Sequence, residues 1–294
     1  MGLCHSITHF QGEINFEVTQ ADFQHGQYNG SVLISNPTMD SSYYLYVNLI
    51  GIEQITTKGF TVSNQFLDIN LMRQKLNGDA QLHIPFDQHI QWEPIYQNYY
   101  SIISDQTLST IVYLECFLAK SSSATSLSSS IVPNTRQIHV VKTKKNRQDI
   151  KPISLNYEPK FAGFAPIIQF NLDKNTYRVG EHLKGKLLVD NTRSQFALVK
   201  NQITILQIID LLFKNDTKYK RLPPQTMIQQ RLDNMHSEKR NLDIDIAITQ
   251  SFNDACTYPG RLYKVNYVIQ LEFMWEDQQT HVMSNEIVIY NEND

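Results

Sequence analysis

The first six residues carry the clearest chemical signal in this chain. Residues 1–6, MGLCHS, match the pattern M-G-x-x-x-[ST], in which a glycine at position 2 accepts a myristoyl chain. Cys4 stands beside that glycine and is placed for palmitoylation. Two chains matter because one myristoyl group alone binds a membrane only marginally. We therefore predict acylation at Gly2 and Cys4; the alternative is an ordinary N-terminus with a small second residue.

A second group of residues could act through its charge. Five cations are crowded into residues 142–151: Lys142, Lys144, Lys145, Arg147 and Lys151. Such a cluster attracts anionic lipid headgroups or an acidic protein by Coulomb attraction. We predict a contact with an anionic surface at Lys142, Lys144, Lys145 and Arg147. The alternative is a solvated loop at the edge of a linker.

Residues that could support catalysis or bind a metal are scattered. The nine histidines show no HExxH or other zinc spacing, and the chain contains no GxSxG, Walker A or GxGxxG motif. Cys116 lies within the apolar run 111–118, which favours a packed core thiol over a nucleophile. We therefore expect no enzymatic activity, no metal and no cofactor.

Composition indicates the class of protein and the cellular compartment to which it belongs. The chain of 294 residues has a formal net charge of −3, with both halves mildly acidic, which argues against nucleic-acid binding. Three widely separated cysteines fit a reducing compartment better than a disulfide framework. No apolar run is long enough to span a bilayer, and we see no secretory signal. We expect a cytoplasmic protein, held at the cytoplasmic face of a membrane if it is acylated.

Alternation of side chains with a period of two residues predicts the strands of this chain. Two sets of side chains alternate along residues 45–51 and 263–273, which predicts strands with one set in the core and the other outward. Turn signals such as Asn36-Pro37 separate these runs. The best helical pattern covers residues 66–76. The Ser-rich stretch 121–130 is predicted to be a flexible loop. The sequence therefore predicts an all-β fold of antiparallel sandwiches.

The chain also resembles itself. Residues 16–36, FEVTQADFQHGQYNGSVLISN, align with residues 170–191, FNLDKNTYRVGEHLKGKLLVDN. The matched pairs are Phe16 with Phe170, Phe23 with Tyr177, Gly26 with Gly180, Gly30 with Gly185 and Asn36 with Asn191. Glycines at matched spacing indicate equivalent turns, since tight connections often need a positive φ. We predict two similar sandwiches in tandem, residues 1–155 and 156–294; the alternative is a chance likeness between two hairpins.

The second copy of this repeat resembles the opening of an arrestin C-terminal domain, with its "DK..Y..GE" pattern between two strands, the second ending in Asn. The matching residues are Leu172, Asp173, Lys174, Tyr177, Gly180, Glu181, Val189, Asp190 and Asn191. In the first half, Gly26, Gly30, the strand 45–51 with Gly51-Ile52-Glu53, and residues 83–86, HIPF, resemble the arrestin N-terminal domain more weakly.

This resemblance implies two tandem immunoglobulin-like sandwiches of the arrestin type, used as a scaffold for other proteins. The expected function is a non-enzymatic adaptor that binds membrane-protein tails or trafficking machinery on the cytoplasmic side. Two alternatives stay open: a structural subunit of a large cytoplasmic, cytoskeletal or coat assembly, and an enzyme with a site grafted on a sandwich. Exposed sheet edges suit the adaptor, because an extended peptide can add to them as a strand.

Overall fold

The computed structural model describes most of the chain, and every regular element in that part is a β-strand. The described residues are 10–23, 25–38, 43–77, 82–90, 99–103, 106–125, 129–141, 143, 150–158, 166–212, 219–232, 238–249 and 257–290. The prediction of an all-β fold is confirmed. The chain divides into two compact units: residues 1–98 with 104–145, and residues 99–103 with 146–294.

The first unit contains two sheets that share one core. Its strands are β1 (Gln11–Asp22), β2 (Gln27–Thr38), β3 (Tyr43–Thr57), β4 (Phe60–Leu76), β5 (Leu82–His89), β7 (Gln106–Ala119) and β8 (Gln137–Val140). The order in one sheet is β1-β2-β5, while the other contains β4-β3-β7 with β8 beside β7. Val32 and Ile84 of the first sheet pack in one buried cluster with Val47 and Leu114 of the second. The unit is therefore sandwich-like.

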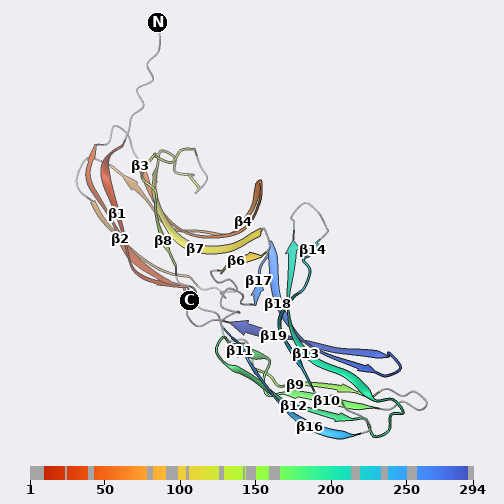
Figure 1. Cartoon of the computed structure of the whole chain (residues 1–294). Coiled ribbons are helices and arrows are strands. Elements are labelled where there is room, and N and C mark those ends of the chain that lie inside the picture. Colours follow the sequence, from red (N-terminus) through yellow and green to blue (C-terminus); the bar gives the residue numbers. More distant parts are fainter. Residues whose placement is uncertain are drawn as a thin grey trace. The chain divides into compact units, whose positions relative to one another are not determined.

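The second unit is built in the same way from two layers, which Figure 1 shows in green to blue. The strands of these layers are β9 (Ile153–Tyr157), β10 (Ile167–Leu172), β11 (Thr176–Arg178), β12 (His182–Asp190), β13 (Leu198–Leu212), β14 (Tyr219–Arg221), β15 (Gln225–Arg231), β16 (Lys239–Ala247), β17 (Tyr258–Pro259), β18 (Tyr263–Trp275) and β19 (Thr280–Tyr290). The short strand β6 (Tyr99–Ile103) is grouped with this unit but belongs to neither of its two sheets. One sheet has the order β16-β12-β10-β9. The other has the order β11-β19-β18-β13-β14, with β15 beside β13 and β17 beside β18.

Strand β18 confirms the predicted alternation. From Tyr263 to Trp275 every second residue is buried, and the residues between them are exposed or half-buried. Strand β3 differs, because its residues 45–51 are all buried. Its second face is covered as well: Tyr46 stacks on Phe117, and Asn48 donates a hydrogen bond to Glu115. The prediction that this face points outward is therefore wrong.

The helix suggested for residues 66–76 is also wrong, since they belong to β4 and pair with β3 at every position except Phe66 and Leu71. The register shifts between Val47 and Asn48, which pair with Met72 and Asn70. A β-bulge here adds one residue to β4. Ile69 and Met72 consequently lie three residues apart while both pack against the core. That spacing imitates a helical stripe.

The repeated segments form hairpins with the same register. Val18 of β1 pairs with Gly30 of β2, and Leu172 of β10 pairs with Gly185 of β12. These pairs correspond through the repeat, as do Phe16 with Val32 and Phe170 with Leu187. A third strand continues each sheet, β5 beside β2 and β16 beside β12.

The first glycine of each repeat also occupies an equivalent turn. Gly26 has φ 71° and Gly180 has φ 91°, the left-handed region that glycine adopts most easily. The Gly26 carbonyl accepts a hydrogen bond from Ile90, just after β5, while the Gly180 N–H donates to Ile248, just after β16. Each turn is therefore tied to the end of the corresponding third strand.

The outer edge of β1 is closed by a side chain of β8. The Phe16 N–H donates to Gln137 Oε1 at 2.8 Å, and Gln137 Nε2 donates to the Ile14 carbonyl. One amide thus supplies the donor and acceptor that a neighbouring strand would offer. Gln137 thereby joins the edges of the two sheets.

Replacing Gln137 by Ala is expected to destabilise the first unit by about 1–2 kcal/mol, because it leaves a backbone donor and an acceptor without this partner. Hydrogen exchange should show faster exchange at the Phe16 amide, while exchange in β12 stays unchanged. His139→Ala, an exposed position on the same strand, is the matched control. Equal protection of Phe16 in both variants would contradict the assignment of Gln137.

Candidate functional site

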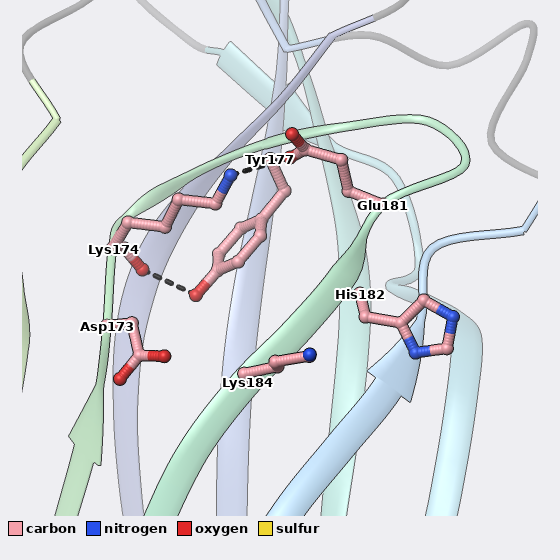
Figure 2. Close-up of a pocket in the computed structure, with 6 residues that line it drawn as sticks. All are labelled: Asp173, Lys174, Tyr177, Glu181, His182 and Lys184. Atoms are coloured by element: carbon pink, nitrogen blue, oxygen red, sulfur yellow. Dashed lines mark hydrogen bonds and ion pairs between the residues drawn. The ribbon is translucent and has the colours of Figure 1, made fainter.

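A shallow pocket lies at the connection between β10 and β12, on the motif that resembles the arrestin family. Its volume is about 380 Å³. Figure 2 shows the six residues that line it: Asp173, Lys174, Tyr177, Glu181, His182 and Lys184. Five of the six are titratable groups at or near the surface, so their pairing decides what the pocket can do.

The motif residues hold one another in place. The Lys174 ammonium lies 2.7 Å from Glu181 Oε2, and the Arg178 N–H donates to the same carboxylate oxygen at 2.9 Å. The Tyr177 hydroxyl donates to the Lys174 carbonyl, a bond drawn in Figure 2. The Lys174 ammonium also lies 5.2 Å from the centre of the Tyr177 ring, within cation–π range. The arrangement fixes the turn that Gly180 makes possible.

The pKa shifts of Tyr177 and Glu181 are consistent with a turn that is held by these bonds. Burial raises the pKa of the Tyr177 hydroxyl, which therefore stays protonated as a donor. Burial alone would also raise the pKa of the Glu181 carboxyl. The hydrogen bond from Arg178 and the Lys174 ammonium outweigh that effect, so the pKa of Glu181 lies below its ordinary value. Glu181 is consequently an anion that serves as an acceptor.

Glu181 should make the second unit sensitive to acid. Because the pKa of Glu181 is lower in the folded chain than in the unfolded chain, the unfolded state binds more protons as the pH falls. The stabilisation is present above the ordinary glutamate pKa and is lost as the pH falls through the lowered, folded-state pKa. We expect it to amount to about 1 kcal/mol or less, since the pair is partly exposed.

Urea unfolding at a series of pH values, followed by Trp275 fluorescence in a Trp92→Phe background, measures this effect. Glu181→Gln should be less stable than wild type at neutral pH, and the difference should shrink in acid. Glu286→Gln, at an exposed position of β19, is the matched control and should show no such convergence. A constant difference between Glu181→Gln and wild type at all pH values would refute the assigned role.

The other pocket residues are His182, Asp173 and Lys184. His182 pairs with Asp245 of β16. Asp173 follows β10 and Lys184 lies on β12, where the Asp173 N–H donates to the Lys184 carbonyl at 3.3 Å. Figure 2 shows both side chains below the Tyr177 ring in the view. Within the pocket, the formal charges of Lys174 and Lys184 balance those of Asp173 and Glu181.

The residues predicted from sequence for lipid and anion contact fall elsewhere. Gly2, Cys4, Lys142, Lys144, Lys145 and Arg147 all lie outside the described residues. Cys116 is fully buried on β7, as predicted, and burial raises the pKa of its thiol. It packs in the core of the first unit and is not accessible as a nucleophile.

A row of polar side chains on the first unit was missed from sequence; Glu115 and Asn48 are buried, while Arg136 and Asn70 at its ends are exposed. The side chain of Glu115 is only 1% exposed, and its Oε2 lies 3.5 Å from Arg136 Nε. Asn48 donates to Glu115 Oε1 at 3.3 Å, and Asn70 donates to Asn48 at 2.8 Å. This row of polar side chains therefore runs across β4, β3 and β7. Its signal was present in the sequence, since Glu115 interrupts the apolar run 111–118.

Within the described residues, no cluster of histidine, cysteine and carboxylate side chains has the geometry of a metal site. The same part of the chain contains no helix that could cross a bilayer. A comparison with protein-family models finds no match, and a comparison with curated proteins finds none.

Proposed function

We propose that this chain is a non-enzymatic, arrestin-like adaptor that binds membrane-protein tails or trafficking machinery on the cytoplasmic side of a membrane. The finer fold, two tandem immunoglobulin-like sandwiches of the arrestin type, is part of this proposal. The observation that carries it is the repeated hairpin, in which Val18 with Gly30 and Leu172 with Gly185 have the same register. Two similar units offer two sets of surfaces to partners.

The contacts in the pocket on the second unit support a scaffold function. Lys174, Tyr177 and Glu181 form bonds that fix the turn. A catalytic centre instead requires a nucleophile or base aimed at a substrate. These bonds therefore support a structural role, in which the motif fixes the shape of the protein surface around the turn.

Several sheet edges are protected against unspecific pairing, which narrows where an extended tail can add. Strand β5 carries Pro85 opposite Ser31, β4 carries two bulges, and Gln137 closes β1. Proline, bulges and covered edges are the devices that block edge pairing. Strand β9 has none of these and no charged side chain, and it pairs in unbroken register with β10. We propose β9 as the edge that receives the tail.

Affinity purification of the full chain followed by mass spectrometry, at low and high salt, tests the adaptor. Membrane-protein tails or trafficking proteins should be captured by wild type and lost from Ser154→Lys/Asn156→Lys, which places two charges on β9. Gln225→Lys/Gln230→Lys, on exposed positions of β15, is the matched control. Equal capture by both variants would reject β9, and capture of no such protein by wild type would reject the adaptor.

Acylation of Gly2 and Cys4 is a second element of the proposal, because it would hold the adaptor at a membrane. Wild-type protein should incorporate a myristate analogue, and Gly2→Ala should not. Equal labelling of both proteins would refute the acylation hypothesis and would leave the adaptor proposal unaffected.

One observation favours the alternative of a subunit in a large assembly. Ile138 and Val140 of β8 are each 56% exposed, and Ile111 of the adjacent β7 is 42% exposed. Exposed apolar side chains that gather on one face mark protein contacts. A subunit should co-purify with its assembly in a fixed ratio that high salt does not change, whereas an adaptor should exchange its partners.

A further inference from the structure

The start of the Ser-rich stretch is fastened to the outer face of the first unit by Tyr46. The Tyr46 hydroxyl donates to the Ser121 carbonyl at 3.0 Å and accepts from the Ala124 N–H at 3.2 Å. The Tyr46 ring itself stacks on Phe117, with ring centres 5.1 Å apart. Residues 121–124 therefore have a defined path on the surface, which differs from the flexible loop expected from sequence.

Ser122 differs from the two serines beside it. The Ser121 and Ser123 hydroxyls lie 3.0 Å apart and hydrogen-bond to each other, and Ser121 Oγ also accepts from the Ser123 N–H. Ser122 is exposed, and its hydroxyl makes no hydrogen bond to any residue that the structure describes. Ser122 thus presents the hydroxyl most open to a reaction.

A guanidinium already lies beside this serine. Arg73 Nη1 donates to the Ser122 carbonyl at 2.8 Å. In the register of β3 with β4, Arg73 is opposite Tyr46 and Lys75 is opposite Tyr44. Residues opposite one another in antiparallel strands share a face. Both cations therefore lie on the face that carries the serines, and no carboxylate in the described part of the chain pairs with either.

We propose that Ser122 is a phosphorylation site whose phosphate is bound by Arg73. A protein kinase would transfer the γ-phosphoryl group of a nucleoside triphosphate to Ser122 Oγ. The bond from phosphorus to the β–γ bridging oxygen breaks, a bond from phosphorus to Oγ forms, and the hydroxyl proton is released with the nucleoside diphosphate.

The product places a charge of about −1.5 to −2 next to Arg73. A phosphate on Oγ is only a few bonds from the carbonyl that Arg73 already contacts, so its oxygens are within reach of the guanidinium. Charge-assisted hydrogen bonds to Arg73 would hold the loop against Tyr46 more firmly. Modification of Ser121 or Ser123 would instead break the hydrogen bonds between those two serines.

Phosphorus NMR of the full chain with phosphoserine incorporated at position 122 tests the contact. The second phosphate pKa of an exposed phosphoserine is about 6. It should be lower by about half a unit at position 122, unchanged at position 129, and restored by Arg73→Gln. Arg73→Lys should retain part of the shift. The same pKa at position 122 with and without Arg73→Gln would overturn the proposal.

Mass spectrometry of the chain isolated from the cells that make it, with phosphatase inhibitors present, tests whether the reaction occurs. The peptide containing residues 121–125 should carry phosphate on Ser122. Recovery of this peptide only without phosphate, or with phosphate on Ser121 or Ser123 alone, would overturn the assignment. Neither experiment depends on the adaptor being correct.

Discussion

Gly30→Ala and Gly185→Ala should each destabilise their own unit by about 1–3 kcal/mol, the usual cost of overpacking. A Cβ at Gly30 would lie 2.3 Å from the Glu17 carbonyl oxygen, and one at Gly185 would lie 2.5 Å from the Asn171 carbonyl oxygen. Both obstacles are backbone atoms of the partner strand. The hairpin itself must therefore shift to admit a methyl group. Valine at either position should cost more than alanine.

Hydrogen exchange followed by mass spectrometry reads each unit separately. Gly30→Ala should weaken protection in β1 and β2, and Gly185→Ala should weaken it in β10 and β12. Ser154→Ala, at an exposed position of β9, is the control and should change stability by no more than about 0.5 kcal/mol. If alanine were tolerated at one glycine and damaging at the other, the two hairpins would not be equivalent.

Trp275→Ala should have the largest effect of any single change discussed, a loss of about 3–5 kcal/mol from the second unit. Trp275 is 1% exposed at the end of β18 and packs against Phe273. Its indole N–H donates to Asn191 Oδ1 at 3.2 Å, and Asn191 Nδ2 donates to the Phe196 carbonyl at 2.9 Å. Removing the indole leaves a large cavity and takes away the donor to the Asn191 oxygen.

Trp275→Phe separates these contributions, since it keeps most of the ring and loses the donor. It should cost clearly less than Trp275→Ala. Circular dichroism during urea unfolding, combined with hydrogen exchange, measures both variants without relying on tryptophan fluorescence. Losses of similar size for Phe and Ala would show that the hydrogen bond to Asn191, and not the packing, dominates this site.

The sequence predicted strands most reliably where only one face of a strand is buried. In β18, Tyr263 to Phe273 alternate because one face meets the core and the other is more exposed. The same rule fails in β3, where the second face is covered by contacts from distant residues such as Phe117 and Glu115. It also fails in β4, where a bulge shifts the alternation. Long-range packing and bulges leave no local periodic signal.

The residue types in the sequence indicated a turn at the candidate site, but they did not indicate which side chains contact one another there. The motif from Asp173 to Glu181 indicated a turn between two strands, and the structure places one there. That Lys174 and Glu181 pair with each other depends on how the turn folds back. The pairing of the buried Glu115 with Arg136, and the contact of Arg73 with Ser122, likewise join residues far apart in sequence.

The repeat is one hairpin geometry that occurs twice, and inter-strand NOEs between Hα protons in the full, protonated chain measure it directly. We predict backbone proton contacts between Val18 and Gly30 and, equally, between Leu172 and Gly185. Contacts at one pair together with a different register at the other would contradict the repeat, and the adaptor proposal would lose the observation that carries it.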